Sequence, residues 1–460
     1  MMQFTPGKER IERQSKTFDL WLWLFLGYVL FWYLQGGYRF PVLGIIRFEF
    51  LLGTLLSIAA VFRIANRGLP RSPIIGWIAA FIIVTILSTV FSVDSGLSWT
   101  VFMDRVIKFM MIGVFIVAFV ESVPSMKLFL GAYLLAFLKM AQEGIFGMVT
   151  GSLVWENQGT PRLHGATPNY AHPNSFAGTQ LANIPFFYFL FPLVPMIVKI
   201  VLGAMTIAAL SIVVFSGSRT AYVALLTMLM SLVFFSRYRK RAFIGVALFA
   251  VIAAPLVPDA YWERFNTIIT QEDKEGASID TRRQIFDDAI LIWKDNPLGI
   301  GVGAFPVVRA EVFSRSQDTH NLYLELATNL GVQGLLVFIG LIVSIMRSLG
   351  RTRRTADQLL ERIQNEANSV SSAGETDSRI RDLLFIRAIA ISMLSFVITR
   401  LTLGMFGHDL YEVYWWFSAG MAVALEKLVS DIPGSGDLSI KRNLQERKQN
   451  SERPRITTEI

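Results

Sequence analysis

Long apolar stretches recur along the whole sequence, and they constrain the fold more than any other feature. An apolar segment of about 20 residues is long enough to cross the hydrocarbon core of a bilayer as a helix. Inside the bilayer such a segment must satisfy its own backbone hydrogen bonds, which a helix does. The composition agrees, because 53% of the residues are hydrophobic and only 17% are charged. These observations exclude a soluble multidomain enzyme and a disordered chain, and they predict an all-α polytopic membrane protein.

About twelve segments are predicted to span the membrane, and no strand is expected anywhere. The first apolar segment follows a basic stretch without a small-residue cleavage site, so we expect a retained helix rather than a removed signal peptide. The predicted spans are residues 19–34, 42–62, 73–91, 106–120, 127–150, 175–194, 196–216, 220–235, 242–256, 321–345, 383–403 and 411–428.

Basic residues are divided unevenly between alternate loops. About two thirds of the 43 Lys and Arg residues fall on the side that holds both ends of the chain. Cytoplasmic loops carry such an excess, so both termini are predicted to be cytoplasmic. The formal net charge of +8 then reflects topology, and no nucleic-acid partner is expected.

The spans divide the chain into four regions. Residues 1–257 would hold the first nine helices, and residues 258–319 would form a long loop domain on the side opposite the cytoplasm. Residues 320–430 would hold the last three helices, with a cytoplasmic connector at 348–382 that is part helix, and residues 431–460 would be a disordered cytoplasmic tail. The sequence has no cysteine, which excludes disulfides, a thiolate nucleophile and Cys-ligated metal.

Polar residues near the outer membrane face are the candidates for chemistry, because desolvating them costs free energy. This topology brings four groups of them to one side of the membrane. They are Arg162-Leu163-His164-Gly165 with His172-Pro173-Asn174, then Gly217-Ser218-Arg219-Thr220, then Thr281-Arg282-Arg283 with 296–303, and finally Thr319-His320-Asn321.

The order of these motifs resembles the superfamily of O-antigen ligases and O-antigen polymerases. Ser218-Arg219 lies at the tip of a helical hairpin, and an Arg-initiated helix follows in the long loop. Next come the Gly-rich run 296–303 and His320-Asn321, and the series ends at Gly331-Val332-Gln333-Gly334. Each motif alone is weak, but the four occur in the same order and on one side.

The resemblance implies a GT-C-like glycosyltransferase of the bacterial inner membrane whose active site is periplasmic. Its donor would be an undecaprenyl-diphosphate-linked glycan, and its acceptor a sugar hydroxyl of lipid A–core or of a growing polysaccharide chain. Diphosphate is a charged leaving group, and arginine binds phosphate with two donors. The outer loops contain no Asp-x-Asp cluster of the kind that would indicate a Mg²⁺ site. Asp287 and Asp288 are adjacent and would point apart on a helix. We therefore expect no cofactor and no metal.

Arginines are the expected diphosphate ligands. By its match to the motif, Arg219 would bind the diphosphate, although an interfacial arginine that reaches lipid headgroups is the alternative. Arg282 fits the family pattern better than Arg283, and an ordinary solvated helix start remains equally open for both. Ser218 is a possible substrate-binding residue.

His320 is the strongest candidate for catalysis, because a neutral imidazole there could accept the proton of the acceptor hydroxyl. Direct attack on the anomeric carbon would invert its configuration. The alternative is a histidine that packs at an interface. Asn321 would orient a sugar or His320 itself.

The remaining polar groups are open between functional and structural roles. Arg162, His172 and Asn174 precede the sixth span and are possible substrate-binding residues. Lys139 and Glu143 lie four apart on one helix face and predict an internal ion pair. The run Gly299–Gly303 predicts a tight turn that folds the loop back over the site, whereas Gly331 and Gly334 predict close helix packing.

Two other functions remain. An O-antigen polymerase would use the same donor and share the motifs, but it would extend the glycan chain on the carrier. The ligase pattern has Thr just after the second Gly of the last motif, whereas this sequence has Leu335. A transporter or flippase is the alternative from another class. Its halves would be joined by a central cytoplasmic loop, whereas this chain has its largest outer loop between the ninth and tenth predicted spans.

Overall fold

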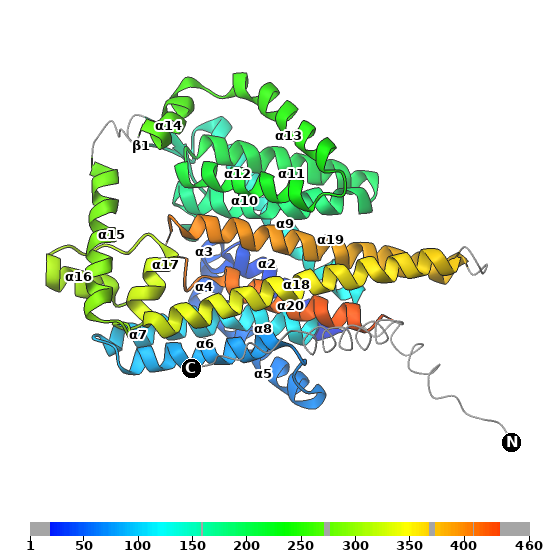
Figure 1. Cartoon of the computed structure of the whole chain (residues 1–460), viewed down its shortest axis with the longest axis horizontal. Coiled ribbons are helices and arrows are strands. Elements are labelled where there is room, and N and C mark those ends of the chain that lie inside the picture. Colours follow the sequence, from blue (N-terminus) through cyan, green and yellow to red (C-terminus); the bar gives the residue numbers. More distant parts are fainter. Residues whose placement is uncertain (1–18, 158–159, 271–276, 368–372, 408, 433–460) are drawn as a thin grey trace, which may run out of the picture.

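A computed structural model describes residues 19–157, 160–270, 277–367, 373–407 and 409–432. The predicted tail 431–460 lies outside these residues except for its first two positions. Helices dominate, and Figure 1 shows the long ones running side by side as a bundle.

The helices of the first third of the chain are separated by short turns. Asp19 caps the first of them, because its carboxylate accepts a hydrogen bond of 3.1 Å from the Trp21 amide. The elements are α2 (Leu20–Tyr33), α3 (Gly36–Arg39), α4 (Pro41–Ile45), α5 (Phe48–Arg67), α6 (Pro73–Val90), α7 (Ser95–Val101), the π-helix η1 (Phe102–Ile107), α8 (Lys108–Phe119) and α9 (Val123–Thr150).

The rest of the chain adds a hairpin, the long loop and the last helices. The elements are β1 (Val154–Asn157), β2 (Thr160–Leu163), η2 (Pro168–Tyr170), α10 (Pro173–Leu190), η3 (Phe191–Leu193), α11 (Met196–Phe215), α12 (Arg219–Phe235), α13 (Arg239–Ala253), η4 (Ala254–Leu256), α14 (Asp259–Thr270), α15 (Ala277–Asp295), α16 (Phe305–Phe313), α17 (Leu322–Glu325), the π-helix η5 (Leu326–Leu330), α18 (Gly331–Ala367), α19 (Ala373–Gly404) and α20 (Val413–Ser430).

Six helical segments among the described residues are long and apolar enough to cross a membrane. They are α5, α6, α9, α11, the run 322–365 and residues 377–404 of α19, and the shorter apolar helices are α2 and α12. Each of the twelve predicted spans contains a helix, although the second is divided between α4 and α5 by a break at residues 46–47. The all-α membrane class is thus supported, and the count of twelve stays a prediction.

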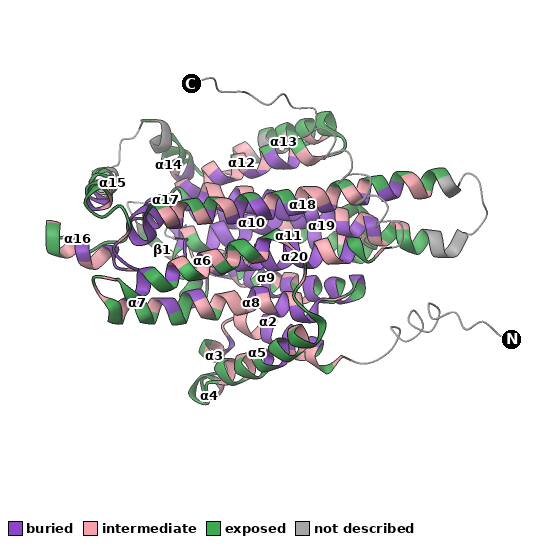
Figure 2. Ribbon diagram, turned by 60° about the horizontal axis from the view of Figure 1, so that its bottom comes forward, coloured by how far each residue is buried: buried purple, intermediate pink, exposed green. Residues whose placement is uncertain are grey.

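Burial distinguishes the central helices from the peripheral ones. The apolar window of α19 is 78% buried, whereas that of α5 is only 17% buried. Figure 2 shows buried residues facing the interior of the bundle and exposed residues on its outside. The exposed side chains of α5 include Phe50, Leu51 and Phe62, as expected for a surface that faces lipid.

The expectation of no strand was wrong. Strands β1 and β2 form an antiparallel hairpin in which Trp155 pairs with Arg162. The segment is too short and too polar to continue α9, which ends at a left-handed Gly151. The hairpin places Arg162 next to the start of α10.

The long loop has its own small hydrophobic core, which includes Ile285, Ile292 and Phe305. Arg309 and Asp288 are both buried, and Nε of Arg309 donates to Oδ2 of Asp288 over 2.9 Å, which joins α16 to α15. Figure 1 shows α15 lying across one end of the bundle. We call this the loop end and the opposite end, where α18 and α19 project, the connector end.

The predicted connector is more helical than expected, because α18 and α19 continue through most of it. With 37 and 32 residues they measure about 55 and 48 Å, longer than a hydrocarbon core of about 30 Å. Buried Leu359 and Leu383 show that the two helices still pack together there.

Candidate functional site

A cavity of about 750 Å³ opens into the bundle at the loop end. Three of the residues predicted from the sequence, His172, Asn174 and His320, line it together. Its walls come from both halves of the chain, including α2, α9, α10, α19 and α20. The volume lies within the usual range for ligand sites, which is roughly 300–1,000 Å³.

His320 lies at the point where the long loop enters α17, and its side chain is exposed toward the cavity. Its backbone has a φ of 49°, in the left-handed region that most side chains avoid. Such backbone strain is concentrated at functional sites, where the surroundings enforce it. Here the hydroxyl of Thr319, hydrogen-bonded to the Asn321 amide over 3.4 Å, closes the turn.

Asn321 has a clear structural role beside His320. Its Oδ1 accepts hydrogen bonds from the Tyr323 and Leu324 amides and caps α17, and its Nδ2 donates to the Met405 carbonyl over 3.0 Å. These bonds fix the backbone next to His320 to the end of α19. Asn321 therefore holds the histidine in place, and it lies outside the lining of the cavity as far as the described residues go.

Arg162 connects three segments around the start of α10. Its Nη2 donates to Oδ1 of Asn174 over 2.7 Å, and its Nε donates to the Ser216 carbonyl over 2.8 Å. His172 caps α10, because its Nδ1 accepts from the Asn174 amide over 3.2 Å. Arg162 is buried and acts through Asn174, whereas His172 and Asn174 line the cavity themselves.

The tip of the α11–α12 hairpin reaches the same cavity. Ser218 is fully buried and caps α12 through its hydroxyl, which accepts from the Ala221 amide over 3.2 Å. Arg219 is the first residue of α12, and its neighbour Thr220 lines the cavity. Arg219 is half-buried and, among the described residues, is not part of the lining itself.

Arg282 and Arg283 lie on the exposed side of α15, which crosses the loop end (Figure 1). Neither is among the described residues that line the cavity. Asp287 and Asp288 point apart as predicted, because Asp288 is buried against Arg309 while Asp287 is exposed.

The turn 296–303 binds the long loop to the bundle. The amides of Ile300 and Gly301 donate to the carbonyls of Thr328 and Asn329 over 2.9 and 3.1 Å. Gly299 has a φ of 91°, and a Cβ there would lie 2.6 Å from the Asn329 carbonyl oxygen. The predicted tight turn is therefore present. Gly331 contacts the backbone of Leu298 in this turn rather than a neighbouring helix, which differs from the packing role expected for it.

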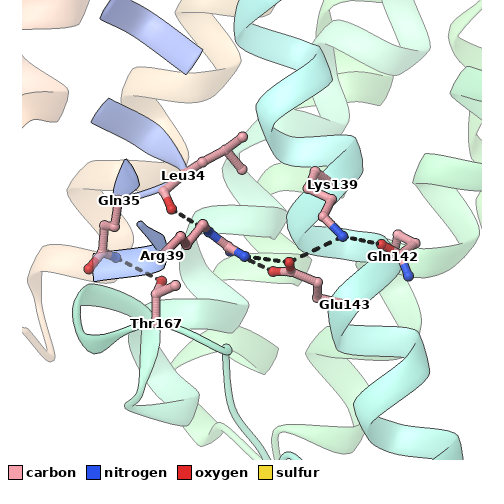
Figure 3. Close-up of polar contacts among 7 residues, drawn as sticks. All are labelled: Leu34, Gln35, Arg39, Lys139, Gln142, Glu143 and Thr167. Carbon is pink, nitrogen blue, oxygen red and sulfur yellow. Dashed lines mark hydrogen bonds and ion pairs between the residues drawn. The ribbon is translucent and has the colours of Figure 1, made fainter. Parts of the chain in front are cut away.

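A polar network fixes the segment between α2 and α4 that forms one wall of the cavity. Figure 3 shows Glu143 between Arg39 and Lys139. Arg39 donates to both carboxylate oxygens of Glu143 over 2.6 Å, and Lys139 lies 3.3 Å from Oε1, which confirms the predicted Lys139–Glu143 ion pair. Gln35, which lines the cavity, donates to the Thr167 hydroxyl over 2.8 Å.

Several charged lining residues were not identified as site candidates from the sequence. Arg105 pairs with Glu412 over 2.8 Å, and Lys108 pairs with Glu49 over 2.8 Å. Asp104 belongs to the π-helix η1, an irregularity that often occurs at functional sites. No sequence motif marks these residues, because their partners are hundreds of positions away or on another helix.

Aromatic and amide side chains form the inner wall. The Tyr133 hydroxyl donates to Oδ1 of Asn183 over 2.8 Å, and both residues line the cavity. Tyr170 lies outside the predicted spans, and burial raises the pKa of its phenol, which keeps it neutral and able to donate a hydrogen bond. Neutral aromatic and amide groups of this kind suit a sugar, which presents both hydroxyls and apolar ring faces.

Comparison with known proteins adds one positive finding. Residues 204–339 match the family model described as O-antigen ligase. We call residues 204–339 the O-antigen ligase domain, after the family to which they are similar. The match confirms the predicted relationship to the superfamily of O-antigen ligases and polymerases. No curated protein matched the chain with significant similarity.

The O-antigen ligase domain covers less than a third of the chain and runs from within α11 into α18. It contains Arg219, Arg282, Arg283 and His320. Arg162, His172 and Asn174 precede it, and the α19 and α20 residues of the cavity follow it. The ligase domain therefore contributes only part of the cavity wall.

Proposed function

We propose that this protein is a ligase-type glycosyltransferase of the bacterial inner membrane. It would move a glycan from undecaprenyl diphosphate to an acceptor sugar hydroxyl on the periplasmic face. The supporting observation is that the O-antigen ligase domain contributes His320 and Thr220 to a cavity of about 750 Å³. That cavity also has the aromatic and amide lining that a glycan needs.

His320 is the proposed general base. It accepts the proton of the acceptor hydroxyl while that oxygen forms a bond to the anomeric carbon of the donor. The bond from this carbon to the diphosphate oxygen breaks, and its electron pair leaves with the diphosphate. Attack from the side opposite the leaving group inverts the anomeric configuration.

Arg219, Arg282 and Arg283 are the proposed ligands of the diphosphate. Arg219 begins α12 one residue before Thr220 of the cavity wall, and α15 carries the other two at the same end of the bundle. Their charge offsets the charge that develops on the leaving group. The proposal also includes metal independence, because the positively charged guanidinium groups would take the place of a metal ion.

A polymerase that extends the glycan on its carrier is the second candidate within this family. Leu335, on α18 inside the ligase domain, favours a polymerase, because the ligase pattern has Thr at this position. Both reactions use the same donor and the same proposed residues and differ in their acceptor.

A deletion strain tests the proposal and distinguishes the two reactions. For a ligase, we expect long glycan chains that are made but not attached to lipid A–core. For a polymerase, we expect single repeats in place of long chains. Lipopolysaccharide and secreted polysaccharide that both match the parent strain would contradict the proposal, and re-expression of the intact gene is the control.

A further inference from the structure

Arg400 is a buried cation in the wall of the cavity. It lies on α19, one turn before that helix ends at Gly404, and its exposed fraction is 3%. A charged side chain at this depth in a membrane helix costs free energy, so its presence indicates a function. Because Arg400 also lines the cavity, that function concerns what the cavity binds.

The neighbours of the Arg400 guanidinium are neutral. Its central carbon lies 3.1 Å from the centroid of the Tyr414 ring, and its Nη2 donates to the Thr179 hydroxyl over 3.4 Å. Its Nε is buried and has no hydrogen-bond partner. No carboxylate in the described part of the chain lies within 4 Å of it, although Asp104 and Asp409 line the same cavity.

The other two basic residues of the lining differ in this respect. Arg105 and Lys108 each pair with a carboxylate, Glu412 and Glu49, over 2.8 Å. Stacking on an aromatic ring offsets part of the cost of burying a guanidinium, but only a negatively charged partner offsets the greater part. Among the residues that the structure describes, Arg400 therefore lacks the carboxylate partner that Arg105 and Lys108 each have, and an anionic ligand would supply it.

We infer that Arg400 forms an anion subsite for an oxyanion of the glycan substrate, either a carboxylate of an acidic sugar or a phosphate. The identification of the ligand as a glycan rests on the proposed function. Tyr133, Asn183 and Phe417 also line the cavity, so neutral aromatic and amide groups share this wall with Arg400. This subsite is separate from the arginines proposed for the diphosphate, which lie outside the lining among the described residues.

Binding of small probes to the purified full-length protein tests this inference. Tryptophan fluorescence would be titrated with glucuronate, with glucose as its neutral counterpart, and with inorganic pyrophosphate. We expect at least one anion to bind, and Arg400→Gln to weaken that binding roughly tenfold or more. Dependence of glucuronate binding on Arg400 would identify an acidic sugar, whereas dependence of pyrophosphate binding alone would identify a phosphate.

Two further variants keep the test decisive. Arg347→Gln, which removes an exposed arginine of α18 outside the cavity lining, is the matched control and should bind the anions as the natural protein does. Thr179→Asp places a carboxylate beside the guanidinium and should reduce anion binding even where Arg400→Gln does not fold. The inference is overturned by a natural protein that binds neither anion, or by unchanged affinity for both anions in the folded Arg400 or Thr179 variant.

This experiment separates the subsite from the proposed reaction, because it requires no glycan transfer. Arg400-dependent binding in a protein that transfers no glycan would leave the subsite in place and remove the proposed function. Glycan transfer by a protein whose anion binding does not depend on Arg400 would support the proposed function and remove the subsite.

Discussion

The left-handed backbone of His320 decides how its role should be tested. Alanine at a φ of 49° is strained, so a loss of activity in His320→Ala would combine a missing imidazole with a disturbed turn. Asparagine tolerates this conformation and has no basic nitrogen. The pair of variants therefore separates the chemistry of the side chain from the geometry of the backbone.

Replacing His320 with Asn should lower glycan transfer by about 10²- to 10⁴-fold, the usual contribution of a general base, with expression and membrane insertion unchanged. Transfer is measured in membranes supplied with donor and acceptor. His164→Ala is the control, because His164 lies nearby but is not among the described residues that line the cavity. Full transfer by His320→Asn would remove this residue from the mechanism.

Arg219→Lys should reduce transfer roughly tenfold or more, because a lysine keeps the charge but loses the two-donor fork that binds phosphate. The same assay measures it, and Arg347→Lys, on α18 outside the cavity lining, serves as the control. Near-normal transfer would mean that Arg219 only anchors the hairpin at the membrane surface.

At the residue scale, the sequence identified the candidates that carry a motif and missed those that do not. His172, Asn174 and His320 meet at one cavity as their shared side of the membrane predicts. Arg400 had a signal, a charge inside the predicted span 383–403, but no motif marked it as a candidate. Arg105 had no comparable signal, since its partner Glu412 comes from the far end of the chain.

At the element scale, the buried pair of Arg309 and Asp288 holds the loop helices together. Asp288→Asn leaves a guanidinium without its charge partner in a buried position, which costs about 3–5 kcal/mol. We expect this variant to expose the segment 277–313 to limited proteolysis. Asp287→Asn, at an exposed neighbouring position, is the control, and equal protease resistance of the two variants would contradict this role.

Helices were predicted more reliably than the elements between them. Apolar length identifies a membrane helix because the bilayer imposes it, and each predicted span contains one. The β-hairpin was missed because its two strands of four residues carry no apolar alternation. The helical connector was only partly predicted, because charged residues are so frequent there that the spacing of the leucines that pack α18 against α19 is hard to recognise in the sequence.

At the scale of the whole molecule, the proposed reaction predicts insensitivity to chelators. Transfer in washed membranes should keep its rate when EDTA is added, because guanidinium groups rather than a metal ion would offset the charge of the leaving group. A metal-dependent glycosyltransferase assayed alongside is the control. Strong inhibition that Mg²⁺ reverses would contradict this part of the proposal.

The assembly of the cavity could not be predicted from the sequence. Alternation of charged loops places residues on a side of the membrane, but it does not say which helices are neighbours. The contact of α10 with α19 and of α8 with α20 joins segments more than 200 residues apart. Such pairings depend on side-chain packing across the bundle rather than on a local pattern.

The division of the cavity between the ligase domain and the surrounding helices bears on how such enzymes diversify. An exchange of residues 204–339 between two homologues would transplant His320 but leave behind Tyr133, Asn183 and Arg400. On the proposed mechanism, the hybrid would combine the general base of one parent with the sugar-binding residues of the other. An exchange meant to transfer sugar specificity would therefore have to include the helices before and after this domain, or replace their cavity-lining residues individually.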